Sequence, residues 1–342
     1  MAAAVSAKVL AEVNRLHYIP LPPITLQALL KRGPRFAPAV AEHLQHNPAE
    51  LQQVPIRLAR RIVDLDNLPD DLPNAPSVQD VRSLLLRSFE ELINFPLPIN
   101  LETEHEFVEL HRRLRKEHVG MHSGLAAAVQ ALTYEPKGLT ESLDAFYGSR
   151  IGIRMLVDQH IAAQTPLPGF SGIVADHCSP VQIARDGDAA AVYRYIPQHI
   201  ELILAEVLKN AVLNSLKSVA QKGKGATPPP VSVLVAGGPH GVCIKVSDVG
   251  GGMTRAEANA LQSYYHAAGA DATTIASPYD PVAGALDRRV RGALDFSDSF
   301  GLRIASLYAQ YFGGALSLMP MEGHGVDTYV YMSCLTGASE VQ

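Results

Sequence analysis

The sequence predicts a protein of two parts: a four-helix-bundle-like domain over residues 1–170 and an α/β sandwich over residues 171–342. Three observations lead to this fold class. Apolar residues recur at helical spacing up to about residue 165. After about residue 190, two pairs of short β-branched segments each flank a glycine-containing turn. A helical pattern precedes each pair, which indicates one sheet covered by helices on one face.

The first half contains three strong helical patterns, at "VRSLLLRSFEELINF" (81–95), "EFVELHRRLRKEHVG" (106–120) and "LDAFYGSRIGIRMLVDQHI" (143–161). In each of them apolar residues return every three or four positions. The proline-rich stretch "NLPDDLPNAPS" (67–77) separates neighbouring helices. Few alternating β-branched runs occur here, so a helical bundle is expected.

The second half predicts a helix over about 197–219 and then a hairpin of "VSVLVAGG" (231–238) with "VCIKVSD" (242–248). A second helix is expected at 301–312. It is followed by a hairpin of "ALSLMPM" (315–321) with "VDTYVYMSC" (326–334). The segment between Tyr265 and Phe300 has little apolar periodicity. A loop of that length is expected to be an active-site lid or disordered.

Composition narrows the class of protein. The chain has 342 residues, 47% hydrophobic content and a net charge of −5, with no basic block, so no nucleic-acid partner is expected. Its three cysteines, Cys178, Cys243 and Cys334, are far apart, which favours a reducing compartment. No apolar run reaches the ~18 residues that a membrane span needs. The alanine-rich start suggests either an organellar transit peptide or an ordinary first helix.

The stretch "AEVLKNAVLNS" (205–215) carries an unusual group of polar side chains on a core-packing helix. Glu206, Lys209 and Asn210 lie within about a third of a turn of one another, because each residue advances by about 100°. A carboxylate, an ammonium group and a carboxamide therefore follow one edge of the apolar face. Such an edge can line a polar pocket.

Two glycine-containing segments suggest ligand contacts but are weak signals alone. In "VSDVGGGM", Asp248 ends a strand and is followed by Gly250 and Gly252, which would let the backbone approach a planar ring. The ordinary interpretation is an Asp-Gly turn. In "DFSDSFGLRIASL", Asp298 or Ser299 is expected to cap a helix that Gly301 opens. Helix N-termini bind phosphate, but many are simply capped.

The order of these motifs along the chain is more specific than any one of them. A Glu-x-x-Lys-Asn helix edge, Asp-x-Gly-x-Gly, a lid and a Gly-Leu helix start together resemble the ATP-binding domain of the gyrase, Hsp90, histidine-kinase and MutL superfamily. Four further blocks are similar to the mitochondrial protein kinases of the α-ketoacid dehydrogenase complexes: "VPIRLARRI" (54–62), "LPDDLPNAPSV" (68–78), "FYGSRIGIRMLVDQHI" (146–161) and "LYAQYFGGALSLMPMEGHGVDTYVYM" (307–332). The pyruvate dehydrogenase kinase branch fits better than the branched-chain branch.

The resemblance implies a role for each matching residue. Glu206 would be the general base for a serine hydroxyl, with Lys209 beside the phosphates and Asn210 coordinating Mg²⁺, a cation that prefers oxygen ligands. Asp248 would bind the adenine amine. The remaining pocket residues would be Gly250, Gly252, Gly301, Leu302 and Thr328, the last replacing an adenine-facing threonine whose position here is Val326.

A regulatory pocket is also implied. His118 is also a catalytic candidate, because it matches a family histidine near the active site, while His122 is a neighbour without such a match. Arg150 and Arg154 lie four residues apart on one helix and would, with His118, bind small carboxylates such as pyruvate. The alternatives are a structural histidine and a surface arginine pair in salt bridges.

Several family positions differ in this chain. Leu213 replaces an arginine, and Ser297, Asp298 and Ser299 stand where a glycine-rich lid end is usual. Leu85 replaces a tyrosine of the carboxylate pocket. The chain has no tryptophan, although family members end in a longer tail with an Asp-Trp pair that helps bind the lipoyl domain.

The sequence therefore predicts an ATP- and Mg²⁺-dependent protein serine kinase of the mitochondrial matrix. It would phosphorylate and inactivate the dehydrogenase subunit of an α-ketoacid dehydrogenase complex, with pyruvate dehydrogenase as the expected substrate, and would form a homodimer that contacts the lipoyl domain. The alternatives are a non-catalytic regulatory module of that complex, a branched-chain α-ketoacid dehydrogenase kinase and a protein histidine kinase.

Overall fold

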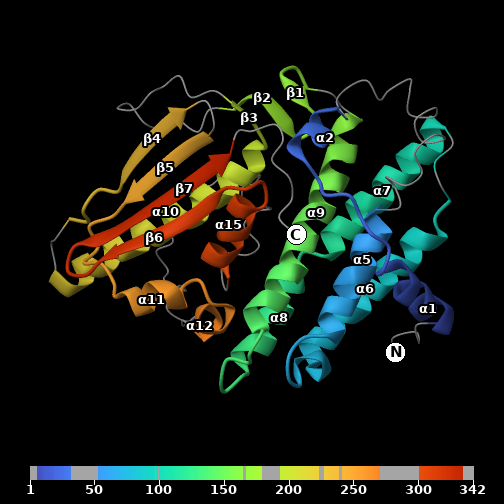
Figure 1. Cartoon of the computed structure of the whole chain (residues 1–342), viewed down its shortest axis with the longest axis horizontal. Coiled ribbons are helices and arrows are strands. Elements are labelled where there is room, and N and C mark those ends of the chain that lie inside the picture. Colours follow the sequence, from blue (N-terminus) through green and yellow to red (C-terminus); the bar gives the residue numbers. More distant parts are fainter. Residues whose placement is uncertain are drawn as a thin grey trace. The chain divides into compact units, whose positions relative to one another are not determined.

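The computed structural model describes residues 6–31, 53–96, 98, 100–164, 167–178, 193–222, 227–238, 241–269 and 300–333. The chain forms two compact units. The first comprises residues up to 173 except for 25–27, and the second comprises 25–27 together with residues from 174 onward. The first is helical and the second combines helices with an antiparallel sheet, which confirms the predicted fold class (Figure 1).

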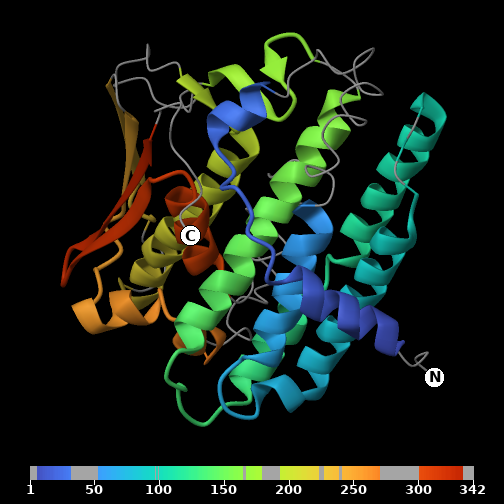
Figure 2. The same ribbon diagram turned by 45° about the vertical axis from the view of Figure 1, so that its right-hand side comes forward.

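The first unit is a bundle. Helices α5, α6, α7 and α9 lie side by side, with α5 packed on both α6 and α9, and α7 on α9 (Figures 1 and 2). Its elements are α1 (Ala7–Leu16), α2 (Leu26–Lys31, of which residues 26 and 27 are assigned to the second unit), α5 (Gln53–Asp66), the 3-10 turn η1 (Leu72–Asn74), α6 (Pro76–Asn94), α7 (Leu101–Glu117), α8 (Met121–Gln130), α9 (Leu139–Ala163) and the short strand β1 (Phe170–Ser171).

Local sequence explains where the bundle helices begin. Pro76 is the first residue of α6, where its missing N–H costs no intrahelical hydrogen bond. Helix α7 begins with a capping box: the Asn100 side chain accepts from the Thr103 N–H at 2.9 Å, and Thr103 Oγ1 accepts from the Asn100 N–H at 3.1 Å. The apolar positions predicted from the sequence, such as Leu85 and Phe89, are fully buried.

The second unit contains both predicted hairpins. Its elements are β2 (Val174–Cys178), β3 (Tyr193–Tyr195), α10 (Pro197–Lys222), β4 (Ser232–Gly238), β5 (Gly241–Ser247), α11 (Arg255–Ala260), α12 (Tyr264–Gly269), α15 (Gly301–Gln310), β6 (Ala315–Met321) and β7 (Gly325–Ser333). The small antiparallel pair β2–β3 had no counterpart in the sequence prediction.

The four main strands form one antiparallel sheet in the order β4-β5-β7-β6. Alternate residues of β5, among them Ile244 and Val246, are buried, as are Val326 and Val330 on β7. Helices α10 and α15 pack against each other and against this buried face, and both lie on the same side of the sheet (Figure 2). Because every second residue of each strand is buried, the pairing register of the strands is fixed, and so is the face of the sheet that the helices cover.

Helix α15 begins at Gly301, as predicted, but its N-cap differs from the sequence prediction. The N-cap residue is Phe300, whose side chain makes no capping hydrogen bond, where Asp298 or Ser299 was expected. Phe300 is 2% exposed and its ring meets Tyr264 edge-on at 4.9 Å. Apolar packing of Phe300 therefore fixes the first turn in place of a polar cap. Asp298 and Ser299 themselves, with Ser297 and most of the predicted lid, lie outside the described residues.

None of the described helices combines the length and the apolar character that crossing a bilayer would require.

Candidate functional site

Helix α10 carries the polar edge that the sequence predicted. Glu206 is 5% exposed, whereas Lys209 and Asn210 are half-buried. The helix packs on the sheet at β5 and β7, and its residues Ile203 and Val207 are almost fully buried. The three polar side chains therefore lie on the flank of a helix that the core holds in position.

The first turn of α15 approaches α10 at Glu206. A Cβ added to Gly301 would lie 2.7 Å from Glu206 Cδ and would overlap its Oε2 atom. No side chain fits there unless the carboxylate moves. The absence of a side chain at Gly301 thus places the N-terminal turn of α15 directly beside the Glu206 carboxylate.

The loop after β5 approaches the same helix eight residues further on. A Cβ added to Gly250 would lie 2.5 Å from the Asn214 carbonyl carbon and 2.8 Å from Asn214 Cβ. Asp248 orders this loop, because its Oδ1 accepts from the Gly250 N–H at 2.9 Å and its own N–H donates to the Val326 carbonyl at 3.1 Å. Asp248 is 3% exposed.

These two contacts define a line along α10. The rise per residue puts Glu206 and Asn214 roughly 12 Å apart along the axis. Asn210 lies midway, about one turn from each contact. A ligand that extends along this edge would meet the Asp248 loop at one end and the helix start at Gly301 at the other. That distance suits a purine nucleotide with its phosphates extended.

The loop at Asp248 is held tightly against the β6–β7 hairpin. Gly252 has φ +72°, and a Cβ there would overlap the Met321 carbonyl oxygen. The Gly251 N–H donates to the His324 carbonyl at 3.0 Å. Thr328 is 4% exposed and lies on the same buried face of β7 as Val326, paired with Val246 of β5. Leu302, in the first turn of α15, is also buried.

The donor set at this edge fits a metal that arrives with the nucleotide. Among the described residues no group of three histidine, cysteine or acidic side chains could hold a metal ion. One amide oxygen from Asn210 would leave most positions of an octahedral Mg²⁺ to phosphate oxygens and water, which is how Mg²⁺ is usually held.

The first unit encloses a separate small cavity of about 50 Å³. Arg150 and Arg154 line it from α9, and His118 lines it from the end of α7. The structure therefore brings these three predicted residues to one cavity. The residues that line it are Val54, Leu58, Arg61, Leu92, His111, Leu114, Arg115, His118, Arg150, Ile153, Arg154 and Val157. Leu85 is fully buried and does not line it.

His118 is neutral in this setting. Burial lowers its pKa to about 3, with further lowering by the charges of Arg61, Arg150 and Arg154. Its Nε2 lies 2.8 Å from Ser88 Oγ, and Ser88 Oγ donates to the Leu84 carbonyl at 3.1 Å. Because Ser88 has one hydroxyl hydrogen, both contacts are satisfied when Nε2–H of the neutral ring donates to Oγ. Nδ1 is then an acceptor.

His122, unlike His118, does not line this cavity. It is 5% exposed, and its ring stacks on Tyr147 with centroids 5.4 Å apart. Burial keeps its pKa well below the usual value for histidine.

Comparison with known proteins gives the same assignment as the motifs. Residues 23–175 match the family model of the mitochondrial branched-chain alpha-ketoacid dehydrogenase kinase. The mitochondrial pyruvate dehydrogenase (acetyl-transferring) kinase of Arabidopsis thaliana is 32% identical over 325 residues, which cover 84% of each chain. The chain belongs to the mitochondrial α-ketoacid dehydrogenase kinase family.

Mammalian members of this kinase family show the same relationship. Pyruvate dehydrogenase (acetyl-transferring) kinase isozyme 4 of Mus musculus is 29% identical, with 84% of this chain and 76% of the mouse protein covered. Isozyme 1 of Rattus norvegicus is also 29% identical, with 84% and 72% covered. The alignments thus extend over most of the two units.

Three charged or titratable residues that line the cavity of the first unit were not predicted from the sequence: Arg61, His111 and Arg115. Arg61 could have been noticed, because it interrupts the apolar face formed by Leu58, Ile62 and Leu65 at helical spacing. His111 and Arg115 lie one turn apart in a strongly charged stretch, where the sequence alone does not distinguish inward from outward side chains. Asn214 was also missed, because its contact with Gly250 joins residues that are far apart along the chain.

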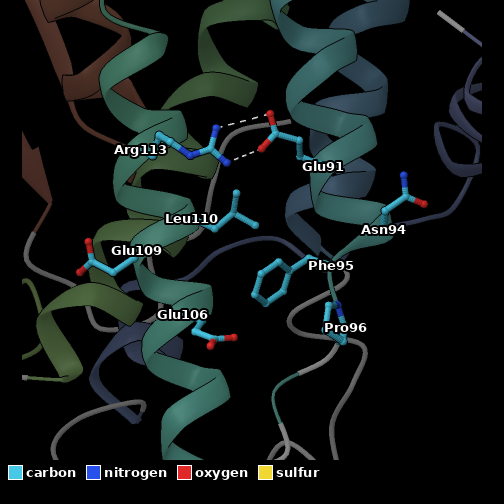
Figure 3. Close-up of a pocket in the computed structure, with 8 residues that line it drawn as sticks. All are labelled: Glu91, Asn94, Phe95, Pro96, Glu106, Glu109, Leu110 and Arg113. Atoms are coloured by element: carbon cyan, nitrogen blue, oxygen red, sulfur yellow. Dashed lines mark hydrogen bonds and ion pairs between the residues drawn. The ribbon is translucent and has the colours of Figure 1, made fainter.

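An open groove of about 600 Å³ lies where α6 and α7 face each other (Figure 3). Phe95, Pro96 and Leu110 form its apolar part, and Glu106 and Glu109 lie along α7. Arg113 is paired with Glu91 across the groove. None of the site residues predicted from the sequence lines it.

Proposed function

We propose that this kinase uses ATP and Mg²⁺ to phosphorylate a serine of the dehydrogenase subunit of an α-ketoacid dehydrogenase complex, and that the added phosphate inactivates that subunit. The observation that supports this best is the contact of Gly301 with Glu206, which puts a helix N-terminus beside a buried carboxylate. The names of the relatives, mitochondrial pyruvate dehydrogenase kinases, favour pyruvate dehydrogenase as the substrate.

The roles of the catalytic side chains follow from their order on α10. Glu206 would accept the proton of the substrate serine hydroxyl, which is a poor nucleophile until that proton is removed. Lys209, on the same edge, would neutralise charge on the transferred phosphoryl group. The N–H groups at Gly301 and Leu302 would contact phosphate oxygens. Phosphoryl transfer depends mainly on such positioning and charge neutralisation.

The metal and the base would be held by the remaining predicted residues. Asn210 would supply an amide oxygen to Mg²⁺, which neutralises the phosphates when it is bound. Asp248 would accept from the exocyclic amine of adenine, with Thr328 near it on the buried face of the sheet. Gly250 and Gly252 let the loop lie close to α10 and to β6, which shapes this end of the pocket.

The cavity of the first unit would be a regulatory site. Its arginines, Arg150 and Arg154, would bind the carboxylate of a small metabolite, and the neutral His118 would donate or accept a hydrogen bond. In this proposal His118 acts in the regulatory pocket, and its link to catalysis is the effect of the bound metabolite on the enzyme. The small volume of the cavity, about 50 Å³, supports a ligand of few atoms.

Assembly and location are part of the same proposal. The face of the sheet opposite α10 and α15 exposes large apolar side chains, with Leu234 at 51%, Met319 at 52% and Tyr331 at 41% exposure. Such a face favours a homodimer through the second unit. Docking on a lipoyl domain and residence in the mitochondrial matrix are proposed because the relatives are named as mitochondrial pyruvate dehydrogenase kinases.

A branched-chain substrate is the second candidate, because the family model that matches residues 23–175 is described as a branched-chain α-ketoacid dehydrogenase kinase. Labelled ATP should be incubated with the protein and each purified dehydrogenase complex in turn. Acid-stable phosphoserine on one dehydrogenase subunit identifies the substrate.

The matched control is Glu206→Gln, which removes the base and keeps the size of the side chain. We expect it to bind ATP but to transfer phosphate about 10²–10⁴-fold more slowly. Absence of label on both complexes, or full activity in this variant, would contradict the proposal. A missing Mg²⁺-dependent rise in melting temperature at millimolar ATP would instead indicate a non-catalytic module.

A further inference from the structure

The groove between α6 and α7 is a surface that the proposed kinase activity does not use. Both helices belong to the first unit, so the groove is formed within one compact part of the chain. None of the residues that line it also lines the small cavity of that unit. With a volume of about 600 Å³ it is much larger than a single side chain, and it is open to the surface. Its size and openness suit a segment of another protein.

The floor of the groove is apolar and is anchored in the core. Phe95 follows the last residue of α6, and its half-buried ring lies 5.6 Å from the ring of Phe107, which is 6% exposed. Leu110 of α7 is 7% exposed. The Phe95 ring and the Leu110 side chain both point into the space between the two helices (Figure 3). A ligand would therefore meet a fixed apolar surface beside the exposed Pro96.

One end of the groove is already neutralised. Arg113 of α7 pairs with Glu91 of α6 across the groove (Figure 3), and Arg113 Nη1 also donates to Glu117 Oε1 at 3.2 Å. Two carboxylates thus compensate this guanidinium, so Arg113 is not free to attract an anion. The pair also shows that a guanidinium and a carboxylate from opposite walls meet within the width of the groove.

The other end has an excess of negative charge. Glu106 lies below the Phe95 ring in Figure 3, and it forms no ion pair with another residue in the part of the chain that the structure describes. Glu109, on the outer side of α7, shares its charge with Arg112 at 2.6 Å. The last turn of α6 contains no basic residue, so the partial negative charge of that helix end is not offset within the helix. This end of the groove therefore favours a cation.

We propose that the groove binds a segment of a partner protein that presents an arginine next to an apolar residue. The guanidinium lies over the Phe95 ring and pairs with Glu106, and its methylene stem packs on Leu110. The neighbouring apolar residue rests against Pro96. Arginine fits better than lysine, because a planar guanidinium can stack on a ring while it donates to a carboxylate. The inference does not depend on the proposed phosphorylation.

Peptides that differ only in this side chain test the proposal. Gly-Leu-Arg-Leu-Gly, blocked at both ends, is compared with the same peptide carrying citrulline, which has nearly the same shape as arginine but no charge. Titration of the full chain by saturation-transfer-difference NMR gives both dissociation constants. The arginine peptide should bind about tenfold more tightly than the citrulline peptide. A lysine peptide should fall between them, since it keeps the charge and loses the stacking.

Two variants of the groove define the contacts. Glu106→Gln keeps the size of the side chain and removes its charge, so the arginine and citrulline peptides should then bind within about twofold of each other. Phe95→Leu should weaken the arginine peptide about threefold through loss of the ring. Should Phe95→Leu fail to fold, Glu106→Gln still decides, because Glu106 is an exposed side chain.

The matched control is Glu141→Gln, an exposed carboxylate in the first turn of α9 that does not line the groove. It changes the net charge of −5 by the same amount as Glu106→Gln and should keep the wild-type preference for arginine. An equal loss of preference in both variants would mean that the peptide responds only to overall charge and would refute the site.

Three other results would overturn the proposal. The first is the absence of saturable binding by the arginine peptide. The second is equal binding of the arginine and citrulline peptides, which would indicate an apolar occupant instead. The third is an undiminished preference for arginine in Glu106→Gln.

Discussion

The contact between Gly301 and Glu206 can be tested by adding a single methyl group. In Gly301→Ala the new Cβ would lie 2.7 Å from Glu206 Cδ and would overlap Oε2. Ordinary contacts to a Cβ begin near 3.4 Å, so the carboxylate must move by roughly 1 Å. Because the Glu206 side chain is only 5% exposed, it has little free space to move into, and overpacking of this kind costs about 1–3 kcal/mol of stability. A displacement of about 1 Å at a reacting group can reduce the rate about 10²-fold.

The assay combines kinetics with thermal unfolding. Gly301→Ala should lower kcat about 10²-fold, equivalent to about 2.7 kcal/mol in the activation free energy, and should also lower Tm. The double variant Gly301→Ala with Glu206→Asp provides the control, because the shorter carboxylate relieves the overlap. It should recover much of the lost Tm without recovering activity. Gly148→Ala, where an added Cβ has no neighbour within 4 Å, should cause no such loss.

Two results would refute the reasoning. Full activity and an unchanged Tm in Gly301→Ala would mean that the start of α15 is not held against Glu206. Additive losses of stability in the double variant would mean that the two residues do not interact, since residues in contact show coupling in a double-mutant cycle.

Two further predictions concern other parts of the molecule. Asn210→Ala should remove the Mg²⁺-dependent part of ATP binding, seen as loss of the extra rise in Tm when Mg²⁺ accompanies ATP, whereas an unchanged Mg²⁺ effect would remove Asn210 from the metal site. His118 has a folded-state pKa of about 3 against about 6.5 in an unfolded chain, so the unfolded state binds more protons and stability is lost as pH falls from 6.5 towards 3. His118→Asn should reduce this loss in denaturant titrations at several pH values; an unchanged pH slope would contradict the assignment.

Local patterns in the sequence determined the order of elements and the positions of the catalytic candidates along it. Period-3.6 and period-2 patterns are properties of short segments, because a helix or a strand buries one face whichever partner covers it. The Glu206–Asn210 edge, the Asp248 turn and both hairpins could therefore be located without coordinates. The resemblance to a kinase family then gave these residues their proposed roles.

The N-cap of α15 could not be predicted in this way, although the first residue of the helix, Gly301, was. The polar residues Asp298 and Ser299 favoured a conventional cap, but the structure uses the buried ring of Phe300 against Tyr264. That choice depends on a residue 36 positions away along the chain. Propensities describe only near neighbours, so tertiary packing overrides them.

What the sequence alone determined is which residues share a helix edge, a strand face or a turn, because backbone geometry fixes these relations within a few residues. Only the tertiary structure decided which distant residues meet: Gly301 with Glu206, Gly250 with Asn214, and Arg61 with the two arginines of α9. The physical reason is that these contacts depend on close packing between elements, where the absence of one Cβ or the inward turn of one buried guanidinium sets the shape and charge of a site.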